Sequence, residues 1–451
     1  MKRYRWLLGC CLFLSIGMLW AADEPDLRML QQKAAQSRDM EGYVGVCKYL
    51  YQTEENPELL LLYADSIHQL ATKSKKPEQL VEYYIWASEG NFIKGDFQQG
   101  YALKRKAIAL AEKAGLKFAI SQSCCDMGYY CNVDARYDSA RYYFRKGLEA
   151  GEDLSEAGEA CRTMLTNYAS SFLFDGKTDS ALVYTIRASE RSAADKDTAM
   201  LIENLNQLGT IYRRKKDLEN CIANFEQALH LCELRGNHNA VAFIYGNIAT
   251  AYCDWNRPGD AIPFSEKAVE YALKTGNKRR IGTCYVNLGA IQTRLVQMRA
   301  EGIATLLKAI PILEEVNDRR LLCDAYNYLV NAYRMDGNLN QAMYYLQKLD
   351  KLAHEMQTDA ERFRYYQAKA GLLQESKKYT EAIIYYRRII DMLRSGYKDA
   401  RDYEHYKRLA ECYLAVNNSS QAYEYLTQAY ALRDSAFHTE QTEQLSEYSV
   451  K

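Results

Sequence analysis

Residues 206–228 read NQLGTIYRRKKDLENCIANFEQA. Small residues stand at Gly209, Cys221 and Ala228, separated by twelve and then seven positions. Seven residues make two helical turns, so Cys221 and Ala228 share one face of a helix, while Gly209 lies on the preceding helix. The large ring of Phe225 follows Cys221 by four positions and can fill the space that the small residues leave. The stretch therefore predicts two helices that cross at close range.

The same spacing recurs along the chain with a period of 40 or 41 residues, which indicates a repeat architecture. Three columns of nine positions can be aligned, and 24 of these 27 positions hold Gly, Ala, Ser or Cys; average composition would place such residues at roughly a quarter of them. The column that contains Cys221 consists of Gly100, Ala140, Ala181, Cys221, Ala261, Gly302, Ala342, Ala382 and Ala422. Nine helix pairs are therefore expected over residues 76–432.

Turn-forming residues occur between the predicted helices. Residues 257–259 (Arg-Pro-Gly) and 417–419 (Asn-Asn-Ser) separate the two helices of their units, while Gly236 and Gly276 stand where a second helix should end. The expected fold is all-α: an α-solenoid of about nine 40-residue helix-turn-helix repeats with irregular end helices.

The small–aromatic–small spacing on paired helices resembles the tetratricopeptide repeat, most closely at residues 206–212, 260–268 and 287–289. The departure is length, because tetratricopeptide units usually have 34 residues. The resemblance implies a right-handed superhelix whose first helices line a concave groove.

The ends of the chain follow other patterns. Residues 1–22 are interpreted as a signal peptide, residues 23–75 as N-terminal capping helices, and residues 433–451 as a C-terminal polar helix. The last segment resembles the part of bacterial membrane-linked tetratricopeptide regulators that follows their exported sensor portion. The chain as a whole therefore also resembles the exported sensor portion of these regulators.

The N-terminal segment has the layout of an export signal. Lys2, Arg3 and Arg5 precede an apolar stretch over residues 7–20. The expected location is exported, periplasmic or envelope-associated. An uncleaved N-terminal anchor and acylation at Cys10 are the alternatives. No later segment reaches 18 apolar residues, so no further membrane span is expected.

Net charge and cysteine content argue against two classes of protein, namely nucleic-acid-binding proteins and disulfide-stabilised domains. Lys and Arg number 58, as do Asp and Glu, so net charge gives no reason to bind nucleic acid. Of 13 cysteines, 11 lie beyond the signal, an odd number scattered among apolar positions, which is typical of buried thiols. One bridge, between Cys284 and Cys323, is the alternative.

Enzyme and metal motifs are not found. The sequence Gly-Lys-Thr at 176–178 lacks the earlier glycine of a phosphate-binding loop, and the six histidines lack metal-ligand spacing. No cofactor, no metal and no catalytic residue are therefore predicted. The chain is expected not to be an enzyme.

Amide and cationic residues recur on the first helices of successive units. They are Asn167, Asn206, Arg213, Asn247, Asn287, Arg294, Asn327, Asn331 and Arg334. Asn offers a donor and an acceptor that match a peptide bond, and Arg offers a fork for a carboxylate. The resemblance implies a groove that binds a peptide or protein segment, in the sensory or scaffolding part of a bacterial envelope signalling system. Hydrogen bonding between neighbouring helices is the other interpretation of these residues, and an assembly scaffold that uses convex or end surfaces is the alternative function.

Overall fold

The computed structural model describes residues 27–449 apart from 54–55, 357, 398 and 400–401. All regular elements in this part of the chain are helices, and it contains no strand. The signal peptide predicted over residues 1–22 lies outside the described residues.

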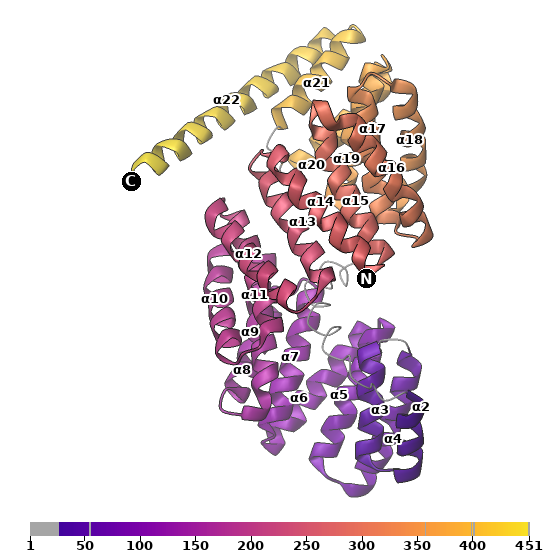
Figure 1. Cartoon of the computed structure of the whole chain (residues 1–451), viewed down its shortest axis with the longest axis vertical. Coiled ribbons are helices and arrows are strands. Elements are labelled where there is room, and N and C mark those ends of the chain that lie inside the picture. The colour runs from indigo at the N-terminus through magenta and orange to yellow at the C-terminus, as the bar shows by residue number, and fades with distance from the viewer. Residues whose placement is uncertain (1–26, 54–55, 357, 398, 400–401, 450–451) are drawn as a thin grey trace. The chain divides into compact units, whose positions relative to one another are not determined.

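The helices follow one another along the chain (Figure 1). They are α2 (Leu27–Ser37), α3 (Met40–Thr53), α4 (Pro57–Ser74), α5 (Pro77–Lys94), α6 (Phe97–Ala114), α7 (Lys117–Val133), α8 (Tyr137–Gly151), α9 (Gly158–Phe174), α10 (Thr178–Ala194), α11 (Thr198–Arg214), α12 (Leu218–Leu234), α13 (His238–Asp254), α14 (Pro258–Thr275), α15 (Lys278–Arg294), α16 (Arg299–Glu315), α17 (Arg319–Met335), α18 (Leu339–Leu352), α19 (Asp359–Glu375), α20 (Tyr379–Arg394), α21 (Asp402–Ala415) and α22 (Ser419–Ser449). Short 3₁₀ helices occur at η1 (Ser155–Ala157), η2 (Val296–Met298) and η3 (Ala353–Glu355).

Nine helix pairs run from α5/α6 to α21/α22, which confirms the expected all-α stack. Two compact units make up the chain, residues 1–247 and 248–451, and α13 spans their boundary. In each pair we call the two members the first and the second helix.

Small residues allow the two helices of a pair to cross closely, as predicted. A Cβ atom added at Gly209 of α11 would lie 2.6 Å from Cε1 of Phe225 in α12. Gly128 of α7 faces Phe144 of α8 in the same way. Both phenylalanines are fully buried. The aromatic ring of the second helix therefore occupies the volume that a larger side chain on the first helix would need.

Many of the loops between helices are tight, because one residue in each of them adopts the left-handed conformation. Ala135, Asn256 and Asn417 have φ values of 56°, 56° and 61° between the helices of a pair. Gly236 and Gly276, with φ values of 64° and 65°, follow α12 and α14 as predicted.

A buried ionic network joins three helices of the first unit. Lys104 of α6 is fully buried and contacts Glu89 of α5 and, at 2.9 Å, Asp126 of α7. The hydroxyl of Tyr130 donates to the second oxygen of Glu89 at 2.7 Å. Burial raises the pKa of Glu89, and Lys104 opposes this shift. The two carboxylates raise the pKa of Lys104 despite its desolvation, so the ammonium is held charged between them.

The eleven cysteines from Cys47 to Cys412 are all free thiols, and ten of them are buried. The alternative bridge between Cys284 and Cys323 is not formed, since both thiols are free. Within the described residues, no helix is sufficiently long and apolar to span a membrane.

Candidate functional site

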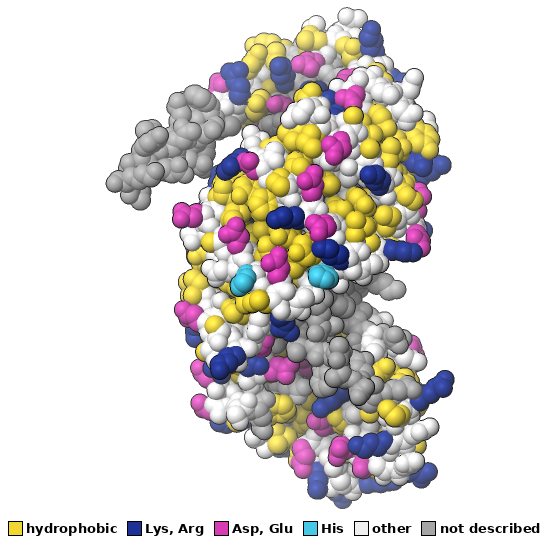
Figure 2. Space-filling view, viewed as in Figure 1, with side chains coloured by type: hydrophobic (Ala, Val, Ile, Leu, Met, Phe, Trp, Pro, Cys, Tyr) yellow, Lys and Arg dark blue, Asp and Glu magenta, His cyan; other side chains and the backbone are white. Residues whose placement is uncertain are grey.

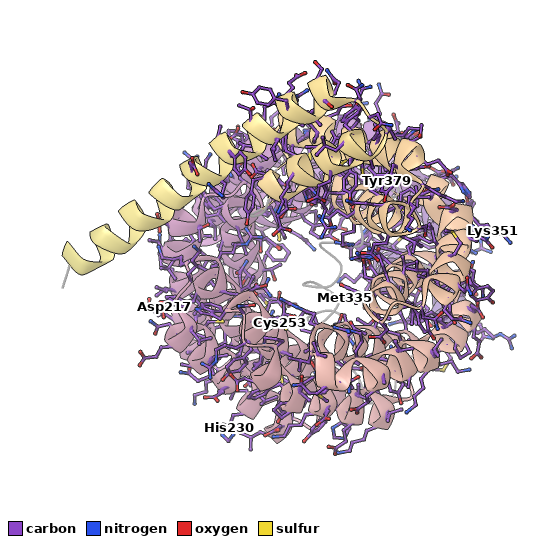
Figure 3. The ribbon with its side chains drawn as sticks, turned by 90° about the horizontal axis from the view of Figure 1, so that it is seen from above. Asp217, His230, Cys253, Met335, Lys351 and Tyr379 are labelled. Carbon is purple, nitrogen blue, oxygen red and sulfur yellow. The ribbon has the colours of Figure 1, made fainter. Side chains whose placement is uncertain are left out.

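The predicted site residues all lie on first helices. Asn167 is in α9, Asn206 and Arg213 are in α11, Asn247 is in α13, Asn287 and Arg294 are in α15, and Asn327, Asn331 and Arg334 are in α17. In the second unit, Figure 3 places Met335 of α17 toward the inner side and Lys351 of α18 on the outer side.

In the first unit, hydrogen bonds link the asparagines of successive first helices. The amide of Asn132 donates to the backbone oxygen of Asn167 at 3.0 Å. The amide of Asn247 donates to Oδ1 of Asn206 at 2.7 Å. Asn167 and Asn206 are buried. These contacts are hydrogen bonds between neighbouring helices, which was the other interpretation of the asparagines. A role in partner binding at these positions stays a prediction.

Further amides extend this network, although the sequence pattern did not single them out. Asn204 accepts a 2.8 Å hydrogen bond from the hydroxyl of Thr166 and donates to Ser192 at 3.1 Å. Gln207 donates to the hydroxyl of Ser170 at 2.6 Å. All five side chains are buried. Because their hydrogen bonds are satisfied internally, they hold α9, α10 and α11 in register.

Glu203 of α11 lies beside this network without a partner of its own. The residue is only 7% exposed, and its Oε2 atom has no hydrogen-bond partner among the described residues. Burial raises the pKa of Glu203 from its ordinary value of 4.5 to about 8. The carboxyl group is therefore neutral in the folded protein at pH 7.

In the second unit, three of the predicted residues are engaged within the protein. The amide of Asn331 donates to the backbone oxygen of Asn327 at 3.1 Å, and Asn327 is buried. Arg334 forms an ion pair with Glu375 of α19. These contacts connect α17 internally and to the next first helix.

Asn287 and Arg294 differ from the other predicted residues. They stand seven positions apart on α15, so they share one face of the helix. Both residues are exposed. Neither side chain has a hydrogen bond or ion pair with another described residue of the structure. An amide and a guanidinium are therefore presented together to solvent.

The surroundings of Arg294 come from two neighbouring first helices, α13 and α17. Arg294 interacts electrostatically with Cys253 of α13 and with Tyr328 of α17. Burial raises the pKa of both groups, and the guanidinium of Arg294 opposes the shift. Arg364 of α19 pairs with Asp324 at 2.8 Å, and both also act on Tyr328. Arg364 thus has Asp324 as its ion-pair partner, whereas Arg294 has no ion-pair partner among the described residues.

We call Asn287, Arg294, Cys253 and Tyr328 the α15 site. Its four members come from α13, α15 and α17. The arrangement can form hydrogen bonds with an amide group and attract an anionic group about two helical turns away. Sequence reasoning missed Tyr328 and Cys253, because tyrosine and cysteine also fill packing positions throughout this chain. Among the described residues, no group of three or more His, Cys, Asp or Glu could hold a metal ion.

Charge is mixed on the face of the second unit that Figure 2 presents. On the face that Figure 2 presents, hydrophobic side chains are interspersed with both signs of charge. A single-sign field that would attract polyanions is not visible on this face.

Stacked helix pairs with small residues at their crossings define a helical-repeat protein. Residues 200–274 match a sequence model of the tetratricopeptide repeat, and residues 363–392 match a second model with the same description. The chain thus contains tetratricopeptide repeats at these residues, and the resemblance of its sequence to this repeat is confirmed. The comparison with curated proteins found no match in sequence.

Several solved structures are similar to this chain at low sequence identity. A STAND signal-transduction ATPase with a tetratricopeptide repeat sensor, from Pyrococcus horikoshii, is 15% identical with a TM-score of 0.53, over 87% of this chain and 55% of that chain. The apo form of the quorum sensor NprR from B. thuringiensis is 16% identical with a TM-score of 0.48, over 78% and 97% of the two chains. Aspartyl phosphate phosphatase F from Bacillus subtilis is 16% identical with a TM-score of 0.48, over 77% and 92%.

Proposed function

We propose that this chain is a non-catalytic binding protein that holds an extended peptide or protein segment against the first helices of its second unit. The observation that supports the proposal is the exposure of Asn287 and Arg294 on one face of α15, without internal partners, beside Tyr328. In the proposal, Asn287 forms hydrogen bonds with the backbone of the segment. Arg294 pairs with a carboxylate, and the ring of Tyr328 supplies apolar contact.

The wider role in the proposal is sensory or scaffolding, in a bacterial envelope signalling system. The basic residues and apolar stretch near the N-terminus support export. The sensor named in the Pyrococcus horikoshii protein belongs to a signal-transduction ATPase, which is the kind of role that a repeat array of this fold can serve. Export is tested by comparing the cellular fraction that contains the full chain with that of a chain lacking residues 1–22.

Binding is tested with peptides selected by the full chain from a random phage-displayed library. The affinity of one selected peptide is measured by calorimetry for the wild type and for Asn287→Ala and Arg294→Ala. We expect the two changes together to weaken binding by about 1–3 kcal/mol, the range for lost hydrogen bonds. The loss of affinity caused by Arg294→Ala should be smaller at high salt, because exposed charges are screened.

The matched control is placed on the outer side of the same unit. Asn340→Ala and Lys351→Ala remove an exposed amide and an exposed cation from α18 and should leave affinity unchanged. Thermal stability should also be unchanged in all four variants. Unaltered affinity in Asn287→Ala and Arg294→Ala would refute the proposal for the α15 site.

A further inference from the structure

The first unit contains a buried carboxyl group that makes no contact within the protein. Oε2 of Glu203 in α11 has no hydrogen-bond partner among the described residues, and the residue is only 7% exposed. Burial is the only cause of its raised pKa, so no charged group of a neighbouring helix acts on it. Such a group lowers stability. A buried titratable residue that costs stability without making a contact is a candidate functional residue.

Other acids at the equivalent repeat position are satisfied. Glu203 stands six positions before the small residue Gly209 of its helix. The equivalent residue of α5 is Glu82, whose carboxylate accepts a 3.0 Å hydrogen bond from the indole N–H of Trp86. In α21 the equivalent residue is Glu404, which is only half-buried and can therefore be hydrated. Burial without a partner is thus a property of Glu203 and not of the repeat position.

A third acid at this position shows which partner Glu203 lacks. Asp324 of α17 pairs with Arg364 of α19 at 2.8 Å, and both stand six positions before the small residue of their helices. Burial raises the pKa of Asp324, and Arg364 opposes this shift. The position of α13 that corresponds to Arg364 holds Phe243. The neighbouring first helix therefore supplies a cation to Asp324 but not to Glu203.

The other groups near this end of α11 do not replace the missing cation. Arg162 of α9 is already paired with Asp195 at 3.1 Å and with Asp197 at 2.8 Å. Asn239 of α13, one helical turn before Phe243, has a buried Oδ1 atom that also lacks a hydrogen-bond partner. The unpartnered atoms of Glu203 and Asn239 are both acceptors. A guanidinium or ammonium group provides only donors, together with the charge that a carboxylate needs.

From these observations we propose that Glu203 binds the basic side chain of an arginine or lysine in a peptide or protein segment. The bound cation takes the place that Arg364 occupies beside Asp324, and its further N–H groups can donate to Oδ1 of Asn239. An ion pair in a buried place compensates the desolvation of the carboxylate. The proposal concerns the first unit and does not depend on the α15 site.

Binding of a cation should change the protonation of Glu203. Its pKa is about 8, so the free carboxyl group is protonated at pH 7. A cation beside the group favours the carboxylate. Binding at pH 7 should therefore release about one proton, and the release should largely disappear at about pH 9, where the free group is already ionised.

Peptides selected by the full chain from a random phage-displayed library at pH 7 test the proposal. We expect Arg or Lys to recur at one position of the selected peptides, and this preference to be lost with Glu203→Gln. Glu219→Gln is the control, because it changes an exposed carboxylate of α12, and it should keep the preference. Circular dichroism checks that both variants are folded. The proposal would be overturned if the wild type selects no recurrent basic residue, or if Glu203→Gln keeps the preference.

Calorimetry with one selected peptide measures the ion pair directly. Replacing the recurrent basic residue by neutral citrulline should weaken binding to the wild type at least about tenfold, the effect of a lost charge-assisted hydrogen bond. Glu203→Gln should bind both peptides about equally. Titrations in buffers of different ionisation enthalpy should detect proton release with the wild type and none with Glu203→Gln.

The same titrations separate this proposal from the proposed function. Asn287→Ala and Arg294→Ala should leave the difference between the basic and the citrulline peptide unchanged, whether or not they alter the affinity itself. Equal binding of the two peptides by the wild type, or the same proton release from the wild type and Glu203→Gln, contradicts a role of Glu203 in binding.

Discussion

Replacing Glu203 with Gln should make the protein more stable at high pH and leave it unchanged at low pH. Glu203 is buried without a partner for Oε2, and its pKa is raised from 4.5 to about 8. Below pH 4.5 the carboxyl group is protonated in both the folded and the unfolded chain and adds nothing to the pH dependence. Between pH 4.5 and 8 only the unfolded chain releases the proton, so unfolding becomes more favourable as pH rises. Above pH 8 the loss of stability that the buried Glu203 causes no longer changes with pH.

The size of this penalty follows from the two pKa values. Each pH unit between them corresponds to about 1.4 kcal/mol, so the full effect above pH 8 is about 5 kcal/mol. Gln has nearly the same shape and no charge. The free energy of unfolding of Glu203→Gln should therefore exceed that of the wild type by several kcal/mol at about pH 9, and differ by less than about 1 kcal/mol at about pH 4. In a unit of this size, such a gain corresponds to a melting temperature about 10 °C higher.

Thermal unfolding followed by circular dichroism, at several pH values, measures this difference. Glu219→Gln serves as the control, because Glu219 is exposed on the neighbouring helix α12, and its effect should be small at every pH. The reasoning would be refuted by a stability difference for Glu203→Gln that does not grow between about pH 4 and pH 9.

Two further changes test the packing of the first unit. Gly209→Ala should lower the free energy of unfolding by about 1–3 kcal/mol, because the added methyl group would clash with Phe225. Gly45→Ala is the control and should be neutral or stabilising, because an added Cβ atom there would have no neighbouring side chain within 4 Å. Urea denaturation of both variants measures this contrast. Lys104→Met should cost about 3–5 kcal/mol by leaving the carboxylate of Glu89 buried without its cation. Adding Glu89→Gln should restore part of that loss, and a double variant no more stable than the single one would contradict this explanation.

The fold was predictable from the sequence because its determinants are local and repeated. A small residue at Gly209 and a ring at Phe225 would each be weak evidence alone. Their recurrence every 40 or 41 residues, however, leaves few alternatives to stacked helix pairs. The turn residues were informative for the same reason, since Gly236 and Gly276 mark positions where the backbone must adopt a positive φ.

The candidate site was only partly predictable, because residue type does not reveal which hydrogen bonds a side chain makes. Asn247 and Asn287 looked alike in the sequence. In the structure the amide of Asn247 donates to Asn206, 41 positions away, whereas Asn287 is exposed. Such distinctions depend on the distance between neighbouring helices and on the side chain opposite. The sequence pattern likewise could not reveal the raised pKa of Glu203, because this shift results from burial of the side chain alone.

The buried thiols give the protein a set of internal reporters of local opening. Burial raises the pKa of Cys232 to about 12 and that of Cys284 to about 11, so very little reactive thiolate is present in the folded state. A thiol reagent should therefore label each buried cysteine only when the helix pair around it opens. Because these residues are distributed from Cys47 to Cys412, mass spectrometry of labelled peptides would show in which order the pairs of the stack unfold, without any engineered probe.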